Sequence, residues 1–215
     1  MGQKVNPISF RLGSYLPWKS RWFAEGKDYK DYLLEDIKIR RFLFEKLKTA
    51  GIVEVEIERL PKTMNIIITV SRPGVVIGRG GSGLEELKKQ ILDLIAKERN
   101  VKDMKIDFRI NEVKDPELSA YLVASRIASD LERRLPHRRV VIKAMERVMQ
   151  AGALGVKVIL SGRIEGADIS RVEKFHLGSV PTQTLRENID YAQVPALPKK
   201  GYVGVKVYIH KKKEK

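Results

Sequence analysis

The stretch VVIGRGGSG, residues 75–83, carries two glycine patterns that predict different folds. Gly78, Gly80 and Gly83 fit G-x-G-x-x-G, which is typical of a dinucleotide-binding turn between a strand and a helix. Gly78 and Gly81 also close a G-x-x-G loop, of the kind that holds single-stranded RNA. The first pattern indicates an oxidoreductase and the second an RNA-binding protein. Because the stretch fits both, the surrounding sequence has to decide between them.

The charge of the chain favours a polyanionic partner. Its 215 residues include 42 Lys and Arg against 27 Asp and Glu, which leaves a formal net charge of +15. A surplus of this size attracts nucleic acid first and an anionic membrane second. We expect no membrane partner, because no apolar run approaches the roughly 20 residues that span a bilayer. The N-terminus also lacks the apolar region of a signal peptide.

The chain contains no cysteine, which excludes disulfides, thiolate metal sites and cysteine nucleophiles. Its three histidines, His137, His176 and His210, lie far apart and lack the spacing of metal ligands. We expect each histidine to be a surface or RNA-facing side chain. The sequence therefore predicts no metal site and no cofactor.

Hydrophobic periodicity predicts a helix and a hairpin before the glycine loop. A helix is expected from Glu35, since apolar residues recur at helical spacing in Ile39, Leu43 and Leu47. Strict alternation of apolar and polar residues then predicts two antiparallel strands with one face exposed to solvent. The first strand has apolar positions at Val53, Val55 and Ile57 and acidic positions at Glu54, Glu56 and Glu58, and the second covers residues 65–70.

A second helix is expected immediately after the glycine loop. Ser82 and Glu85 have the spacing of a capping box at its start. Its predicted buried stripe consists of Leu84, Leu87, Ile91 and Leu94. A third strand follows at residues 104–110, so the predicted order is helix, strand, strand, glycine loop, helix, strand.

The second half of the chain predicts a separate α+β domain. NEVKDPE, residues 111–117, is polar, contains a proline and reads as a boundary. Two helices are expected, at about 117–134 and 138–151, on either side of Pro136. Four strand-like segments follow, namely GVKVILSGR, SRVEKFHLGSV, TLRENIDYAQ and GYVGVKVYIH. The fold class expected for the whole chain is α+β with mainly antiparallel strands in this half.

The context of the glycine loop contradicts a dinucleotide fold. The preceding strand ends near Val70, eight residues before Gly78, and Pro73 intervenes. A dinucleotide turn instead follows directly on a strand that is buried on both faces. The G-x-S-x-G motif, which would present a nucleophilic serine, is absent because Leu84 stands where its last glycine belongs. The lysine of a phosphate-binding P-loop is absent as well. No catalytic constellation is left, so we expect no enzyme.

The RNA interpretation suits the same loop physically. Without side chains on its glycines, a sugar–phosphate backbone can approach the main chain closely. The loop opens the helix that starts at Ser82, whose free N–H groups and positive dipole end favour a phosphate there. The order of the elements resembles a type II KH domain. The predicted RNA-binding residues of the loop are Val76, Ile77, Gly78, Arg79, Gly80 and Gly81.

Further motifs make the resemblance specific, and they run in order over nearly the whole chain. They are MGQKVNPISFRLG, RPGVVIGRGG, LERR, GVKVILSGR, IDYA and GYVGVKVYIH. With them the chain resembles bacterial small-subunit ribosomal protein three. The resemblance implies a non-enzymatic, cytoplasmic component of the head of the small ribosomal subunit, built from two domains. Such a protein binds small-subunit rRNA, contacts head proteins ten and fourteen, and lines the channel through which mRNA enters.

In that family, basic residues of the channel help to melt mRNA structure. The matching stretch here is RRLPHRRVVIK, residues 133–143. Arg138 and Arg139 occupy the two arginine positions, whereas the third basic position falls on Ile142, with Lys143 adjacent. The residues themselves also predict a ridge, because Arg139, Lys143 and Arg147 recur every four residues of a helix. The channel candidates are Arg133, Arg134, Arg138, Arg139, Lys143 and Arg147.

We expect three parts along the chain. Residues 1–37 form a basic, aromatic arm and the start of a helix, residues 38–110 the KH domain, and residues 111–215 an α+β domain with a basic tail. Expected rRNA contacts are Lys4, Arg11, Lys19, Arg21, Arg72, Lys211, Lys212 and Lys213. Two alternatives stay open: a free KH-type factor in transcription or RNA processing and, more remotely, a nicotinamide-dependent enzyme.

Overall fold

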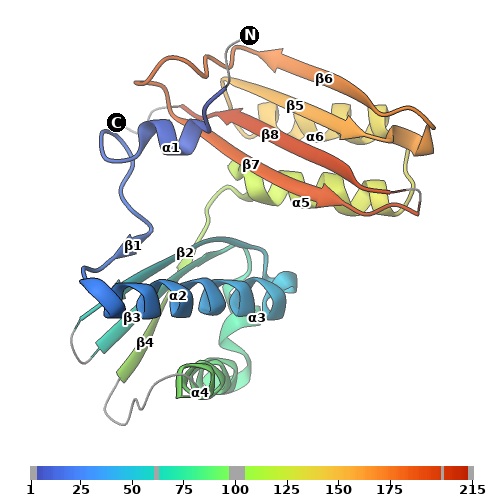
Figure 1. Ribbon diagram of the computed structural model, residues 1–215. Helices are drawn as coiled ribbons and strands as arrows, with labels where there is room; N and C mark the ends of the chain where they lie inside the picture. Colours follow the sequence, from blue (N-terminus) through green and yellow to red (C-terminus); the bar gives the residue numbers. More distant parts are fainter. Residues whose placement is uncertain (1–3, 61–62, 97–104, 200, 213–215) are drawn as a thin grey trace. The chain divides into compact units, whose positions relative to one another are not determined.

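The computed structural model describes residues 4–60, 63–96, 105–199 and 201–212. The chain divides into two compact units, coloured along the sequence in Figure 1. The KH unit is Trp18–Lys114, and the C-terminal unit combines Met1–Pro17 with Asp115–Lys215. This division differs from the arm of residues 1–37 expected from the sequence, because the first part of that arm packs on the far end of the chain.

Arg11 fastens the N-terminal segment to the C-terminal unit. It ends α1 (Pro7–Arg11), and its side chain is only 1% exposed. Its Nε donates to the carbonyl oxygen of Glu187 at 2.7 Å, and its two other nitrogens donate to carbonyl oxygens of Pro7, Thr184 and Thr182 at 2.8–3.3 Å. A buried guanidinium is tolerated when its donors find acceptors in this way.

The KH unit is built on one mixed sheet with the strand order β1-β2-β3-β4. β2 and β3 pair antiparallel, whereas β1 runs parallel to β2 and β4 parallel to β3. The elements are β1 (Ser20–Arg21), α2 (Gly26–Lys46), β2 (Ile52–Arg59), β3 (Thr63–Val70), α3 (Pro73–Ile77), α4 (Ser82–Ala96) and β4 (Lys105–Glu112). The predicted order of helix, strand, strand, loop, helix and strand is confirmed. α2 begins at Gly26, earlier than the predicted start near Glu35.

The core of the KH unit joins apolar residues of α2 and α4 to one face of the sheet. It includes Ile39, Leu43, Val55, Ile57, Ile66, Ile68, Leu87, Ile91 and Ile95. Two predicted core positions are wrong. Val53 is only half-buried because a β-bulge between Ile52 and Glu54 turns Ile52 inward instead. On α4 the buried stripe ends at Ile95, and Leu94 lies beside it, half-buried.

The C-terminal unit is a two-layer α+β fold. Its helices are α5 (Ala120–Glu132) and α6 (His137–Gln150), and its strands are β5 (Gly155–Gly162), β6 (Arg171–Gly178), β7 (Ile189–Ala196) and β8 (Val203–His210). The sheet order is β6-β5-β8-β7, and every pair is antiparallel, as predicted. α5 contacts β7 and β8, α6 contacts β5 and β6, and both helices cover the same face (Figure 1).

The buried face of α6 determines where its basic residues point. Val141 and Val148 are completely buried, and Val140, Ala144 and Met145 nearly so, in a core shared with the sheet. Such a stripe fixes the rotation of a helix about its axis, since turning it would expose all of these side chains. The opposite face of α6, with its arginines and lysine, is therefore held toward solvent.

The corner between α3 and α4 depends on glycines. A Cβ atom on Gly83 would lie 2.7 Å from the carbonyl oxygen of Val76 and 3.0 Å from that of Ile77, so the two helices approach too closely for any side chain. Gly78 has a φ of +71°, in the left-handed region that glycine tolerates. The glycines thus serve a tight helix–loop–helix corner.

We expect Gly83→Ala to destabilise the KH unit by about 1–3 kcal/mol, because the added methyl group overpacks the corner. Thermal and urea unfolding of the full chain measure the effect. The control is Gly74→Ala on α3, where a Cβ meets nothing within 4 Å. This substitution should be neutral or slightly stabilising, and equal destabilisation by both substitutions would contradict the close-approach argument.

Candidate nucleic-acid interface

The G-x-x-G loop lies between two helices of the KH unit. α3 ends at Ile77, Gly78 leaves the helix, residues 79–81 form a 3-10 turn, and α4 begins at Ser82. Gly80 and Gly81 have φ values of +63° and +83°, and a Cβ on either would meet nothing within 4 Å. The loop is therefore open as well as free of side chains at its glycines. This geometry suits close approach by a sugar–phosphate backbone beside the start of α4.

The apolar side of the loop differs from the prediction at one position. Val76 was expected to contact RNA, but it is only 1% exposed and belongs to the core. Val75 and Ile77, on either side of it, are 51% and 39% exposed. The correction follows from helix geometry, because α3 turns Val76 toward the core and the residues on either side of it away. The side chain of Arg79 lies outside the described part of the structure.

The channel candidates lie on α6 and on the turn before it. Arg138, Arg139, Lys143 and Arg147 are exposed on α6, and Arg133 and Arg134 are exposed in the turn. None of these side chains forms an ion pair or hydrogen bond within the described residues. We call Arg139, Lys143 and Arg147 the basic ridge. At a rise of 1.5 Å per residue, neighbouring members stand about 6 Å apart along the helix axis.

Other predicted rRNA contacts are partly neutralised by carboxylates of the chain. Lys19 pairs with Glu54 at 3.2 Å, and Arg21 pairs with Glu56 and Glu58 at 3.2 and 3.1 Å. The wet face of β2 thus binds the segment that precedes α2.

Of the remaining predicted rRNA contacts, one is paired with a carboxylate and three are exposed. Lys211 pairs with Asp190 at 3.0 Å, whereas Lys4, Arg72 and Lys212 are exposed. Lys213 lies outside the described residues.

Arg11 is wrong as a predicted rRNA contact. Its guanidinium is buried and four of its five N–H groups donate to carbonyl oxygens of the chain, so a phosphate cannot reach it. The carbonyl groups come from residues up to 176 positions away, a separation that no local pattern reveals.

His137 connects the start of α6 to two carboxylates. Its Nδ1 lies 2.7 Å from Oε1 of Glu165 and its Nε2 lies 2.8 Å from Oε2 of Glu173. Both carboxylates can accept from the ring only when both of its nitrogens carry protons. The hydrogen bond from His137 lowers the pKa of Glu165, and the charges of His137 and Arg171 act in the same direction. Glu165 holds a φ of +57°, which is unusual for a residue with a side chain.

The histidine prediction is wrong for two of the three residues. His137 and His210 are 3% and 6% exposed, and only His176 is on the surface. His210 contacts the carbonyl oxygen of Ser179 at 2.9 Å and a carboxylate oxygen of Glu187 at 3.1 Å. Both buried rings are structural contacts between segments far apart in sequence.

A buried ion cluster in the KH unit also had no sequence signal. Arg59 donates to Glu35 at 2.6 Å and to Asp36 at 2.6 Å, and all three side chains are about 4% exposed or less. Trp22 donates its indole N–H to the same Asp36 at 2.8 Å. The cluster ties the end of β2 and the segment around β1 to the middle of α2.

The described residues contain neither a metal-binding cluster nor a membrane-spanning helix. Among them, no group of three or more His, Cys, Asp or Glu side chains could hold a metal ion. Within the same residues, no helix is both long enough and apolar enough to cross a membrane.

Both units match known families. Residues 38–118 match the KH domain, and residues 127–209 match the C-terminal domain of ribosomal protein S3. A KH domain joined to that C-terminal domain defines an RNA-binding protein of the ribosome.

Curated relatives match over nearly the full length of the chain. The small ribosomal subunit protein uS3 of Persephonella marina is 50% identical over 98% of this chain and 90% of its own length. The uS3 proteins of Caldicellulosiruptor saccharolyticus and Clostridium novyi are 48% and 44% identical over 98% of this chain and 92% and 93% of their own lengths. The chain belongs to the uS3 family and is a structural, non-enzymatic component of the small ribosomal subunit, which confirms the resemblance seen in its motifs.

We expect Arg79→Asp combined with Gly80→Asp to weaken binding of single-stranded RNA, because it places negative charge where a phosphate would lie. The melting temperature should change little, since position 80 is open and aspartate tolerates a positive φ better than most residues. Fluorescence anisotropy with a labelled RNA measures the affinity. The control, Lys48→Asp with Thr49→Asp, changes the net charge equally on exposed residues. If both variants bind alike, the loop is only a structural turn.

We expect His137→Phe to lower the melting temperature in a pH-dependent way. The folded pKa of Glu165 is lowered, so its contribution to stability is present above the ordinary value of about 4.3 and is lost as the pH falls through the lowered value. The difference between the parent and the variant should therefore be full near pH 6 and shrink in acid. Melting curves between about pH 3 and pH 7 test this, and parallel profiles would contradict it.

Proposed function

We propose that this chain binds small-subunit rRNA in the cytoplasmic ribosome and lines the channel through which mRNA enters. In this role it contacts head proteins ten and fourteen, and α6 helps to open structured mRNA. The G-x-x-G loop is a second RNA contact, separate from α6. The observation that carries the proposal is the basic ridge, whose charges have no internal partner within the described residues.

An uncompensated ridge costs stability unless a polyanion lies against it. Arg139–Lys143 and Lys143–Arg147 are like-charge neighbours four residues apart, and each such pair disfavours a helix by about 0.2–0.5 kcal/mol. Glu146 is the one acidic residue of α6. Elsewhere the chain places carboxylates against exposed cations, as it does for Lys19 and Arg21. The ridge is therefore suited to bind phosphates.

The third basic position of the family falls on an apolar side chain here. Ile142 is 47% exposed, and Lys143 follows it directly on the exposed face. Lys143 is a member of the basic ridge with Arg139, one helical turn away. We propose that Lys143 takes the role of the missing cation.

We expect Arg138→Ala combined with Arg139→Ala to leave folding and incorporation into subunits intact, because both side chains are exposed and unpaired within the described residues. Translation should slow on mRNAs with a stable hairpin ahead of the reading site and much less on unstructured mRNAs. Ribosomes reconstituted with the variant and programmed with matched messages measure this difference. If Lys143 takes the third role, adding Lys143→Ala deepens the defect that is specific to hairpins.

Arg41→Ala with Arg186→Ala is the matched control, since it removes two exposed arginines from other surfaces. It should leave translation of both messages unchanged. Equal slowing of both messages by the Arg138 and Arg139 variant would indicate an assembly defect and refute the channel role.

A further inference from the structure

One face of the sheet in the C-terminal unit is covered by neither α5 nor α6, and the N-terminal segment around α1 borders only part of it. α5 and α6 both lie behind the strands in Figure 1, and α1 lies near one end of β7. Val156, Val158 and Leu160 of β5 point toward the helices and are fully buried. The alternate residues Lys157 and Ile159 point the other way and are half-buried.

The strand register sets the outward side chains in two rows. In one row Lys157 stands between His176 and Tyr208, and in the other Ile159 stands between Lys174 and Lys206. β7 extends the rows with Tyr191 beside Tyr208 and Gln193 beside Lys206. We call these eight residues the open sheet face, defined by Lys157, Ile159, Lys174, His176, Tyr191, Gln193, Lys206 and Tyr208. Neighbouring strands are about 4.8 Å apart, so the lysines form one continuous basic area.

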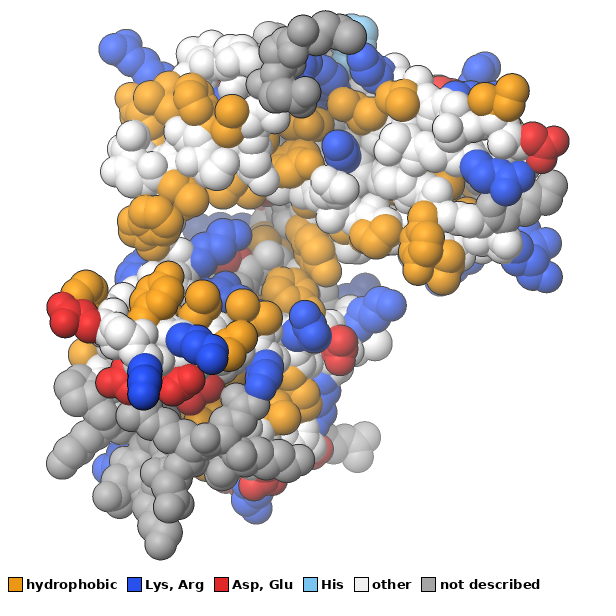
Figure 2. Space-filling view, in the orientation of Figure 1, with side chains coloured by type: hydrophobic (Ala, Val, Ile, Leu, Met, Phe, Trp, Pro, Cys, Tyr) orange, Lys and Arg blue, Asp and Glu red, His pale blue; other side chains and the backbone are white. Residues whose placement is uncertain are grey.

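The open sheet face carries cations without carboxylates. None of the outward residues of its four strands is acidic. The nearby Glu187 is already held by His210 at the end of the face. Burial lowers the pKa of Lys157, and the positive charges of Lys4 and Lys174 lower it further, so these lysines lie close enough to repel one another. Figure 2 shows blue Lys and Arg side chains over this unit and acidic side chains toward its right-hand end.

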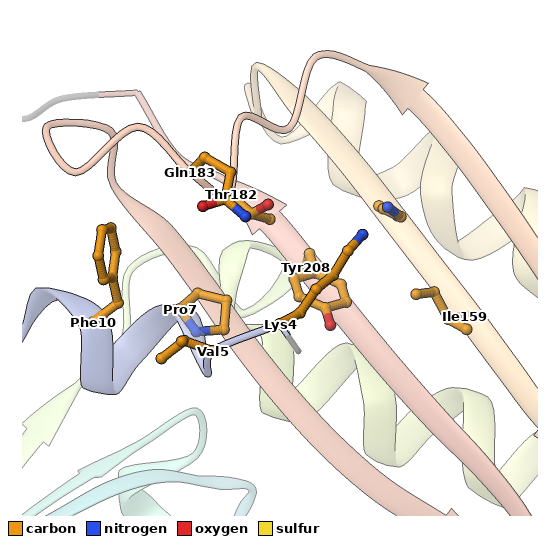
Figure 3. A pocket seen from close by; sticks show the side chains of 9 residues that line it. Lys4, Val5, Pro7, Phe10, Ile159, Thr182, Gln183 and Tyr208 are labelled. Carbon is orange, nitrogen blue, oxygen red and sulfur yellow. The ribbon is translucent and has the colours of Figure 1, made fainter. Parts of the chain in front are cut away.

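Aromatic rings adjoin the lysines. The rings of Tyr191 and Tyr208 lie 4.7 Å apart at an interplanar angle of 42°. Tyr208 also lines an open cavity of about 120 Å³ with Lys4, Phe10 and Lys157 (Figure 3). Burial raises the pKa of both phenols, so both rings stay neutral at physiological pH. Neutral aromatic rings beside lysines can stack unpaired bases while the lysines contact phosphates.

We infer that the open sheet face binds a segment of single-stranded RNA, with phosphates on Lys174 and Lys206 and a base beside Tyr208. The inference rests on the proposed rRNA-binding function and adds a third contact, distinct from the G-x-x-G loop and from α6. Single-stranded RNA fits better than a duplex, because paired bases cannot stack on tyrosines. It fits better than a protein because the eight residues that define the face include three lysines and two tyrosines, and Ile159 is the one aliphatic side chain among them.

The test is the affinity of the full chain for a labelled single-stranded RNA of about 12 nucleotides, measured over a range of salt concentrations. Lys174→Gln with Lys206→Gln should weaken binding and make the slope of log affinity against log salt shallower by about 1.4, since each lost phosphate contact contributes about 0.7. The control, Lys27→Gln with Lys30→Gln on α2, removes the same charge from exposed positions. Its slope should equal that of the parent chain.

A second pair of variants tests the aromatic contact. Tyr208→Leu should lower the affinity about tenfold through loss of stacking. Tyr208→Phe, which keeps the ring, should retain most of the affinity. Melting temperatures of all variants report whether the fold is kept.

The outcomes separate this inference from the proposed function. If the parent chain binds RNA but the lysine variant matches its control, the open sheet face is not an RNA site and the inference fails alone. If the parent chain binds no RNA, the proposed function fails as well. If RNA binding is unchanged but the lysine variant no longer enters small subunits, the face binds an acidic protein segment and the inference is overturned.

Discussion

The close approach of α3 and α4 at Gly83 is the constraint on which the G-x-x-G loop depends. Carbonyl oxygens of Val76 and Ile77 occupy the space where a side chain at this position would lie. The corner closes only because position 83 has no Cβ, and closure leaves Gly78–Gly81 as a short exposed turn directly before α4. The same spacing imitates a dinucleotide fingerprint, although here the third glycine packs two helices together in a fold with an antiparallel hairpin.

The carboxylates of the chain pair with some of its cations and leave others unpaired, which decides where the net charge of +15 is felt on the surface. In the KH unit, glutamates of β2 pair with Lys19 and Arg21, and the buried carboxylates of α2 hold Arg59. In the C-terminal unit, Glu165 and Glu173 are held by His137 at the start of α6. Within the described residues, no carboxylate forms an ion pair with a cation of the basic ridge or of the open sheet face. Positive charge is therefore concentrated on particular surfaces and does not simply make the chain basic.

Local patterns predicted the fold well and long-range contacts poorly. The hairpin, α4, α6 and the four antiparallel strands follow from periodicity, because each has one buried face that a period of two or 3.6 reveals. The bulge that displaces Val53 depends on how two strands pair. The start of α2 escaped prediction because its first half carries exposed apolar side chains, such as Leu33 and Leu34, with no buried stripe.

The same limit applies to the candidate site. The exposure of the basic ridge could be predicted, since the spacing of Val141, Ala144 and Val148 already opposes it. The burial of Arg11 could not be predicted, nor could that of His137 and His210, because their partners come from distant segments. Arginine and histidine have the same appearance in a sequence whether they meet a phosphate or the chain's own oxygens. Only the tertiary contacts separate the two roles.

The contacts that hold α6 in the C-terminal unit also fix the positions of its basic residues. Its apolar face sets the rotation of the helix, and His137 holds its first turn to Glu165 and Glu173 from two other segments. Glu165, whose backbone has a positive φ of 57°, is one of the two carboxylates that contact this ring. Arg138 and Arg139 follow His137 directly, so the end of the helix that carries them is the end that is clamped. The proposed channel role requires cations that hold their position as mRNA moves past them, and a helix end fixed by His137 would provide that rigidity.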